Sequence, residues 1–350
     1  MKRIKVNLGD RSYPIIVNAG LKDKLGEFIQ SSKTVVISSP IIAELYGDVL
    51  ESLNHEYHLV LVPDGEEAKT WSSVEKVLGD LLEYGLDRQS TILALGGGSV
   101  GDLAGFIASI YMRGIDVVQI PTTLLAMVDS SIGGKTAVNH PMGKNLVGCF
   151  HQPSTVLIDP TFLSSLPLRQ IRSGLAEVAK YGVISDDAIF NVLEETPVED
   201  LKGEIMVDLI AKCATVKAGY VQRDERDVKG IRAALNYGHT LGHAVESLSN
   251  HHINHGEGVS IGMNVAAHIS VSLENCGPEL VKRQTELLDS MGLPTKVPDM
   301  PISDLIQVMH RDKKAEGNKI RFVLPRGLGV EPVLRYVPDM RIKSALKELQ

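Results

Sequence analysis

Two histidines and a glutamate recur at helical spacing in the segment LNYGHTLGHAVESL, residues 235–248. His239, His243 and Glu246 are four and three residues apart, so on a helix their side chains share one face. Imidazole nitrogens and carboxylate oxygens are ligands that Zn²⁺ and similar divalent ions take up. The spacing therefore predicts a metal site or an acid–base site in this segment.

More histidines follow directly, so that five of the 11 histidines of the chain fall between residues 239 and 255. Spacing alone favours His239, His243 and Glu246 as the ligand set. It leaves open His255, or an acid from a distant helix such as Glu177. The competing interpretation is a group of core or surface histidines that hold no ligand.

A glycine-rich turn suited to phosphate occurs in TILALGGGSVGDLAGFIASIYMRG, residues 91–114. The segment passes from an apolar strand pattern through glycines into a helix pattern, and a helix N-terminus offers free N–H groups to an anion. Gly96, Gly98 and Gly101 fit G-x-G-x-x-G, but no ribose-binding acid is clearly placed about 20 residues later. The interpretations are a nucleotide site or a tight structural turn, with PDGEEAK, residues 63–69, as a second, weaker candidate for cofactor contacts.

Polar groups accumulate in TTLLAMVDSSIGGKTAVNHPMGKNLVG, residues 122–148. Amide, hydroxyl and charged groups beside flexible glycine turns are better suited to binding a small anion than to packing a core, although a solvated loop is the alternative. In the second half, the i,i+3 pair of Glu177 and Lys180 is by itself an ordinary helix-surface pair. The groups concerned are Thr122, Thr123, Asp129, Lys135, Lys144 and Asn145, and later Lys180, Lys217, Arg232 and Asn236.

The elements that must position these groups change character along the chain. Short β-rich runs alternate with amphipathic stretches in the first half, which predicts an α/β, Rossmann-like domain with a mostly parallel sheet. IKVNLG and YPIIVN predict an opening hairpin, and helical periodicity after Pro167 predicts an all-α domain. We expect domains at residues 1–165 and 166–350. The predicted strands are 33–39, 58–63, 91–97, 116–121 and 154–159, with a helix over 70–85.

Bulk composition narrows the class of protein. A net charge of −7 in 350 residues argues against a general nucleic-acid surface and leaves small anions as ligands. The N-terminus lacks an apolar signal region and no long apolar run occurs, so we expect a cytoplasmic protein without a membrane partner. Three widely spaced cysteines suit neither a disulfide framework nor a cysteine-based zinc site. A transition metal would therefore depend on histidine with Asp or Glu.

The ordered motifs of the chain resemble those of the 3-dehydroquinate synthase family, a group of sugar-phosphate cyclases, over about residues 60–325. The matching segments are PDGEEAK, GGGSVGDLAGFIAS, YMRG, QIPTTLLAMVDSSIGGKTAVN, GKNLVG, SGLAEVAKYGVI, RAALNYGHTLGHAVE, HGEGVSIGM and DKKAEGNKIRFVLP. The resemblance implies an NAD-binding α/β domain followed by a helical metal-binding domain, and a homodimer. It also implies conversion of 3-deoxy-D-arabino-heptulosonate 7-phosphate to 3-dehydroquinate and phosphate, the second step of the shikimate pathway.

The family reaction implies NAD and a divalent metal, Zn²⁺ or Co²⁺, as cofactors. It proceeds by transient oxidation, phosphate elimination, reduction, ring opening and aldol closure. The runner-up function is an NAD- and metal-dependent polyol dehydrogenase of the same fold, whose glycine turn resembles the one around Ser99. An uncharged polyol would not require the basic and amide groups described above. Asp227 is a further departure from the family, which usually has Glu there.

Carried over from the family, the metal ligands are Glu177, His239 and His255, and the catalytic residues are His243, Lys180, Asp129 and Arg232. The substrate contacts are Arg113 (from a dimer partner), Asp129, Lys135, Asn145, Lys180, Lys217, Arg232, Asn236, His243 and Lys314, with Lys313 as the alternative to Lys314. The NAD contacts are Asp64, Gly65, Glu66, Glu67, Ala68, Lys69, Gly98, Ser99, Val100, Gly101, Asp102, Thr122, Thr123, Lys135, Lys144, Phe162, Leu163, Ser164 and Ser165.

Overall fold

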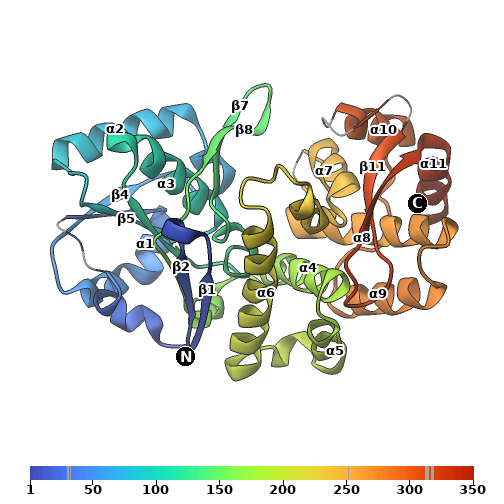
Figure 1. The fold of residues 1–350 in the computed structure, drawn as a ribbon, viewed down its shortest axis with the longest axis horizontal. Coiled ribbons are helices and arrows are strands. Elements are labelled where there is room, and N and C mark those ends of the chain that lie inside the picture. Colours follow the sequence, from blue (N-terminus) through green and yellow to red (C-terminus); the bar gives the residue numbers. More distant parts are fainter. Residues whose placement is uncertain (30, 32, 251, 312–314, 317–318) are drawn as a thin grey trace. The chain divides into compact units, whose positions relative to one another are not determined.

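The computed structural model describes residues 1–29, 31, 33–250, 252–311, 315–316 and 319–350 (Figure 1). This part of the chain forms two compact units: Met1–Pro167 with Gly203–Arg226, and Leu168–Lys202 with Asp227–Gln350. The units are not two continuous halves, because helix α6 (Gly203–Arg223) belongs to the first. The division into functional domains at residues 165 and 166 stays a prediction.

The first unit is built on a seven-stranded sheet in the order β1-β2-β9-β6-β5-β3-β4. All neighbouring strands are parallel except β1, which pairs antiparallel with β2 and forms the predicted opening hairpin. The mostly parallel sheet is thus confirmed. The strands are β1 Lys2–Val6, β2 Tyr13–Val17, β3 Thr34–Ser38, β4 Tyr57–Leu61, β5 Thr91–Gly96, β6 Asp116–Pro121 and β9 Thr155–Ile158.

Local sequence explains where the helices of this unit begin and end. Helix α2 (Trp71–Tyr84) starts at Thr70, whose side chain accepts a hydrogen bond from the Ser73 amide at 3.1 Å. It ends at Gly85, whose φ of 72° is the left-handed conformation of a helix C-terminus. The remaining helices are α1 Pro40–Tyr46, α3 Gly98–Ile110 and α6.

Strand β5 lies at the point where the strand order reverses. The chain runs outward from β3 to β4, returns to β5 on the other side of β3, and then continues to β6 and β9. Ligands of such sheets bind at the carboxyl ends of the strands beside this reversal. Helix α3 begins there, one residue after Gly97.

The prediction of flexible glycine turns for residues 122–148 is wrong for most of the second half of this segment, which forms two paired strands. A π-helical turn, Ala126–Ser130, is followed by the hairpin of β7 (Lys135–His140) and β8 (Gly143–Phe150). A Cβ atom on Gly148 would lie 2.2 Å from the carbonyl oxygen of Thr136 in the paired strand. Glycine therefore permits close strand pairing here and is no sign of a flexible turn.

The second unit is mainly helical, as predicted, but it also contains a small antiparallel sheet that the helical periodicity did not predict. Each strand of the sheet β10-β11-β12 is too short to change the pattern of a long window. Among the described residues, no helix is long and apolar enough to span a membrane. The elements are α4 Leu168–Ile184, α5 Asp187–Glu195, α7 His239–Leu248, α8 His255–Ser272, α9 Pro278–Ser290, α10 Ile302–Arg311, α11 Asp339–Leu349, β10 Ala315–Glu316, β11 Lys319–Leu324 and β12 Val333–Pro338.

Candidate functional site

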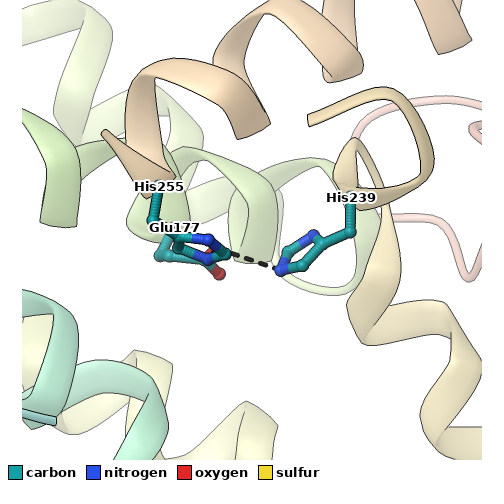
Figure 2. Close-up of side chains that lie close together, drawn as sticks. All are labelled: Glu177, His239 and His255. Atoms are coloured by element: carbon teal, nitrogen blue, oxygen red, sulfur yellow. Dashed lines mark ion pairs between the residues drawn. The ribbon is translucent and has the colours of Figure 1, made fainter. Parts of the chain in front are cut away.

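Three helices of the second unit bring one carboxylate and two imidazoles together (Figure 2). Glu177 comes from α4, while His239 and His255 are the first residues of α7 and α8. One ligand atom from each of the three lies within 4.8 Å of the others. The Nε2 atoms of both histidines are 3.5 Å from Oε1 of Glu177. Two imidazoles and a carboxylate at these distances fit a divalent transition metal such as Zn²⁺ or Co²⁺.

Glycines let the three helices approach closely enough to form this cluster. A Cβ on Gly262 of α8 would lie 1.8 Å from the carbonyl oxygen of Gly238, the residue before α7. A Cβ on Gly256 would lie 2.1 Å from the carbonyl oxygen of Ser173 on α4. Any larger residue at these positions would separate the helices that carry the ligands.

The start of α8 is held by two further interactions. Asn254 and Glu257 form a capping box, in which each side chain accepts a hydrogen bond from the backbone amide of the other. Arg169 of α4 donates two hydrogen bonds of 2.7 Å to the Glu257 carboxylate. Because His255 lies between Asn254 and Glu257, these contacts fix its backbone relative to α4.

Burial and charge set the protonation of the cluster in the metal-free protein. Glu177 is fully buried and pairs with Lys180, which is itself 1% exposed. Burial lowers the pKa of His239 well below its ordinary value, and Lys180 lowers it further, while Glu177 opposes this. Burial also lowers the pKa of His255, but hydrogen bonds to Glu177 and Glu246 outweigh it and raise this pKa to about 9. His239 therefore presents a neutral ring, whereas His255 must release a proton to bind a cation.

The helical spacing in the sequence did not select the residues that the fold groups together. Among the described residues, the group able to hold a metal joins His239 with Glu177 and His255. His243 is exposed, and its ring centroid lies 5.3 Å from that of His239 and 5.9 Å from that of His255. Glu246 contacts His255 instead of joining the group.

In the first unit, the predicted phosphate-binding turn leads from β5 into α3. None of Gly96, Gly98 and Gly101 has a positive φ. They are required by close packing, since a Cβ on Gly98 would lie 2.7 Å from Oγ of Ser130 and one on Gly101 would lie 2.6 Å from Oε1 of Gln119. Close packing therefore accounts for these glycines. It does not account for the buried polar side chains beside them.

Two buried hydroxyls beside this turn have no protein partner among the described residues: Oγ1 of Thr122 and Oγ of Ser130. Thr122 follows β6 and is 2% exposed, and its backbone N–H donates to Gly96. Buried hydroxyls are usually hydrogen-bonded, and the first N–H groups of α3 also lack helical partners. A cradle of this kind fits the pyrophosphate of a dinucleotide. Ser130 was missed in the sequence, although it follows Asp129 directly.

A polar network connects this turn with the 3-10 turn Gly65–Ala68 and the β7–β8 hairpin. The Glu66 carboxylate accepts hydrogen bonds from Ser99 at 3.1 Å and from Asn139 at 2.8 Å. Burial raises the pKa of Glu66, but Lys69, Asn139, Lys144 and Ser99 together outweigh it and lower this pKa. Glu66 is thus held as an oriented anion. Asn139 was also missed in the sequence.

Lys69 is the centre of the same network. It is 2% exposed, and its Nζ donates to Asp102 at 2.6 Å and to Asn145 at 2.5 Å. Burial raises the pKa of Asp102, which Lys69 opposes. The fold thus brings together two residues predicted to contact NAD, Lys69 and Asp102, and one predicted to contact the substrate, Asn145.

Lys217 and Asp129, two of the predicted substrate contacts, pair directly. The Lys217 Nζ is 2.7 Å from a carboxylate oxygen of Asp129 and donates to its carbonyl oxygen at 2.6 Å. The Lys217 side chain is only 6% exposed, whereas that of Asp129 is 27% exposed. The lysine on α6 therefore fixes the π-helical turn, and the aspartate retains access to a ligand.

The other predicted residues differ in their exposure. Phe162 and Leu163 are buried, and the Phe162 carbonyl accepts a hydrogen bond from Tyr46 at 3.0 Å, so these two pack within the unit. Arg232 is 3% exposed and Asn236 is half-buried. Lys313 and Lys314 lie outside the described residues. The exposed residues are Asp64, Gly65, Glu67, Arg113, Lys135, Lys144, Ser164 and Ser165.

Known families cover most of the chain. The family described as 3-dehydroquinate synthase N-terminal matches residues 59–173, and 3-dehydroquinate synthase C-terminal matches residues 174–315. The 3-dehydroquinate synthase of Nostoc sp. is 45% identical over 99% of each chain. That of Thermodesulfovibrio yellowstonii is 45% identical over 99% of this chain and 100% of its own.

Solved structures of other cyclases share the fold along the whole chain. A 2-deoxy-scyllo-inosose synthase complexed with carbaglucose-6-phosphate, NAD⁺ and Co²⁺ is 26% identical, with a TM-score of 0.90 and full coverage of both chains. The 2-epi-5-epi-valiolone synthase of Streptomyces hygroscopicus, with NAD⁺ and Zn²⁺ bound, is 28% identical, with a TM-score of 0.89 over 98% of each chain. A probable glycerol dehydrogenase of Sinorhizobium meliloti, 17% identical with a TM-score of 0.69 over 96% of this chain and 95% of its own, shares the fold alone.

Proposed function

The chain belongs to the 3-dehydroquinate synthase family, and from this premise we propose how its residues convert 3-deoxy-D-arabino-heptulosonate 7-phosphate to 3-dehydroquinate and phosphate. The observation that supports this substrate is the sequence identity of 45% to a 3-dehydroquinate synthase along 99% of both chains. The 2-deoxy-scyllo-inosose synthase and the 2-epi-5-epi-valiolone synthase are only 26% and 28% identical. The reaction makes the chain a carbon–oxygen lyase with no net oxidation.

We assign each cofactor to the group of residues that fits it. The α3 turn, with Thr122, Ser130 and the oriented Glu66, would hold NAD, and Glu177, His239 and His255 would hold Zn²⁺ or Co²⁺. When bound there, NAD would supply a reversible hydride acceptor for the substrate. The metal, when bound, supplies a Lewis acid that stabilises negative charge on substrate oxygens.

The anionic substrate would be held by the buried basic groups. Arg232 and Lys217 are both buried, and a charge-assisted hydrogen bond in a buried site is stronger than one in water. Arg232 suits a carboxylate or phosphate because its guanidinium donates in a fixed fork. Lys135, Asn145, Asn236 and Lys314 would complete the contacts with the substrate.

We propose that His243 transfers protons to and from the substrate. The charged side chains of Lys180 and Asp129 would lie beside the substrate. His243 is exposed beside two predicted metal ligands, so its ring is accessible to a bound substrate. Lys180 neutralises part of the charge of Glu177 in a fully buried pair. Oxidation of a substrate alcohol by hydride loss releases its hydroxyl proton, and the later elimination of phosphate removes a proton from the carbon next to the new ketone; a histidine is suited to move such protons near neutral pH.

The test supplies 3-deoxy-D-arabino-heptulosonate 7-phosphate with Zn²⁺ or Co²⁺ and a catalytic amount of NAD. We expect one phosphate per substrate consumed while the NADH absorbance stays flat. NADH that accumulates with product would instead indicate a dehydrogenase. Absence of phosphate release in the metal-loaded, NAD-saturated protein would contradict the synthase activity.

We also propose that the chain acts in the cytoplasm as a homodimer, in which Arg113 reaches the substrate of the partner copy. Arg113 is exposed, and its φ of 71° and that of Met112, 49°, lie in a region that non-glycine residues seldom adopt. Residues held in such backbone conformations cluster at active sites and ligand-binding segments. A mass measured by light scattering that equals one chain would contradict the dimer.

A further inference from the structure

Glu246, which helical spacing placed among the metal ligands, has a different position in the structure. Its Oε2 lies 3.4 Å from Nδ1 of His255. The other ring nitrogen of His255, Nε2, is the one that lies 3.5 Å from Glu177. The imidazole therefore presents one nitrogen to the metal group and the opposite nitrogen to Glu246.

His239 is arranged in the same way with a different acceptor. Its Nε2 lies 3.5 Å from Glu177, and its Nδ1 lies 3.1 Å from the carbonyl oxygen of Tyr237. A metal-bound imidazole coordinates through one nitrogen and needs an acceptor for the N–H of the other. Both histidines satisfy this requirement, one through the backbone and the other through a side chain.

From this geometry we propose that Glu246 is a positioning residue for His255: it accepts the Nδ1 hydrogen and so directs Nε2 toward the divalent metal. The role rests on the proposed function, because it requires that Glu177, His239 and His255 hold a metal. Glu246 would not touch the ion itself. Chemically it would complete a carboxylate–histidine–metal arrangement.

The helices support this role. Glu246 is two helical turns after His239 on α7, so one helix supplies both a ligand and the group that orients a ligand on α8. The two helices pack closely, since a Cβ on Gly258 would lie 2.8 Å from the Gly242 carbonyl oxygen. A carboxylate on α7 is therefore held at a constant distance from the first residue of α8.

The test measures Zn²⁺ affinity of the full chain after chelation, by competition with a chelating dye, and records the visible spectrum of the Co²⁺ form. We expect Glu246→Ala to weaken Zn²⁺ binding about 10- to 100-fold, the range for loss of such partners of metal ligands. Glu246→Gln keeps an acceptor oxygen without the charge, so we expect a smaller loss. The Co²⁺ bands should shift in the alanine variant and move less in the glutamine variant.

The matched control is the pair of His310 and Asp339 in the same unit. Its side chains are 26% and 22% exposed, against 31% and 16% for His255 and Glu246, and its contact is 3.0 Å. Asp339→Ala removes a histidine–carboxylate pair, and Asp339→Asn keeps an acceptor oxygen without the charge. Neither change reaches the metal group, so Zn²⁺ affinity should stay at the wild-type value in both.

The outcomes separate the two claims. Wild-type chain that binds no Zn²⁺ overturns the metal site itself. Wild-type binding with equal affinity and an equal Co²⁺ spectrum in both Glu246 variants overturns the role of Glu246 alone. Should the alanine variant not fold, the glutamine variant decides in the same way, because glutamine is nearly isosteric with glutamate.

Discussion

His255 and His243 are neighbouring imidazoles with different surroundings. The two ring nitrogens of His255 face Glu177 and Glu246, whereas His243 is exposed and its ring centroid lies 5.9 Å from that of His255. A ring held between two carboxylates is suited to bind a cation, and an accessible ring is suited to move a proton. The two residues should therefore respond differently to removal.

We expect His255→Ala to lose most of its bound metal during dialysis, because two ligands hold a divalent ion far more weakly than three. His243→Ala should keep its metal and lose about 10²- to 10⁴-fold in turnover, the usual contribution of a general acid or base. Metal content measured by atomic emission, together with phosphate release, checks both variants. Equal metal loss in the two would contradict the assignment.

At the scale of single residues, helical spacing in the sequence identified the segment that contains the metal ligand His239. It did not identify the other two proposed ligands. Helical periodicity relates residues within one helix, so it grouped His239 with His243 and Glu246. Glu177 reaches the site from α4, and that proximity depends on helix packing, which local spacing does not contain. The family resemblance named Glu177 and His255, and the structure places both beside His239, while Ser130 and Asn139 were found only from the fold.

At the scale of elements, the glycines of α8 determine how closely the ligand-bearing helices approach. Gly256→Ala would place a Cβ 2.1 Å from the Ser173 carbonyl oxygen of α4. We expect about 1–3 kcal/mol of lost stability from overpacking, and at least about a tenfold loss of Zn²⁺ affinity because His255 moves with the start of α8. Urea unfolding and chelator competition measure the two effects.

The control for that variant is Gly219→Ala in helix α6. A Cβ on Gly219 would meet no atom within 4 Å. The substitution should raise stability by about 0.4–1 kcal/mol through the lower entropy of the unfolded chain, without changing metal affinity. Unchanged metal affinity in Gly256→Ala would show that the close approach of α8 and α4 does not control the site.

The end of α6 gives a prediction for the pH dependence of stability. Arg11 donates hydrogen bonds of 2.9 and 2.8 Å to Glu225 and lowers the pKa of this carboxyl below its ordinary 4.5, although partial burial opposes the shift. A carboxyl whose pKa is lower in the folded state stabilises the fold above the unfolded-state pKa and loses that contribution as pH falls through the folded value. Glu225→Gln should therefore be less stable than wild type at neutral pH, and the difference should shrink below about pH 4.5.

Urea midpoints of both proteins between neutral pH and about pH 3 check this dependence. Glu44→Gln, at an exposed position of α1, is the control for the effect of replacing a glutamate with glutamine on the surface of the same unit. A difference between Glu225→Gln and wild type that stays constant with pH would contradict a role for the ionised carboxyl.

Helices and strands with a clear hydrophobic pattern were predictable from the sequence, whereas short or polar elements were not. The predicted strands at 91–97 and 116–121 match β5 and β6, because buried parallel strands are continuous apolar runs between turn residues. The β7–β8 hairpin carries polar side chains and glycines on an exposed pair of strands, so its alternation is weak. The assignment of α6 to the first unit rests on packing contacts, which no local pattern encodes.

For the whole molecule, the two candidate ligand groups belong to different compact units. The turn proposed for NAD lies in the first unit, and the three proposed metal ligands lie in the second. A ligand that binds only the folded form stabilises the structure that forms its site, by about 2.7 kcal/mol at a concentration of 100 Kd. Each ligand should therefore protect a different set of backbone amides.

We expect removal of Zn²⁺ with a chelator to speed hydrogen exchange at the starts of α7 and α8 and in the middle of α4, where the ligands lie. NAD added to the metal-free chain should slow exchange in residues 64–69 and in the first turn of α3, since those segments surround the proposed dinucleotide cradle. Exchange measured by mass spectrometry on peptides resolves these segments. Protection by NAD confined to α4, α7 and α8 would contradict the assignment of the cofactor to the first unit, and unchanged exchange in these helices after chelation would contradict the metal site.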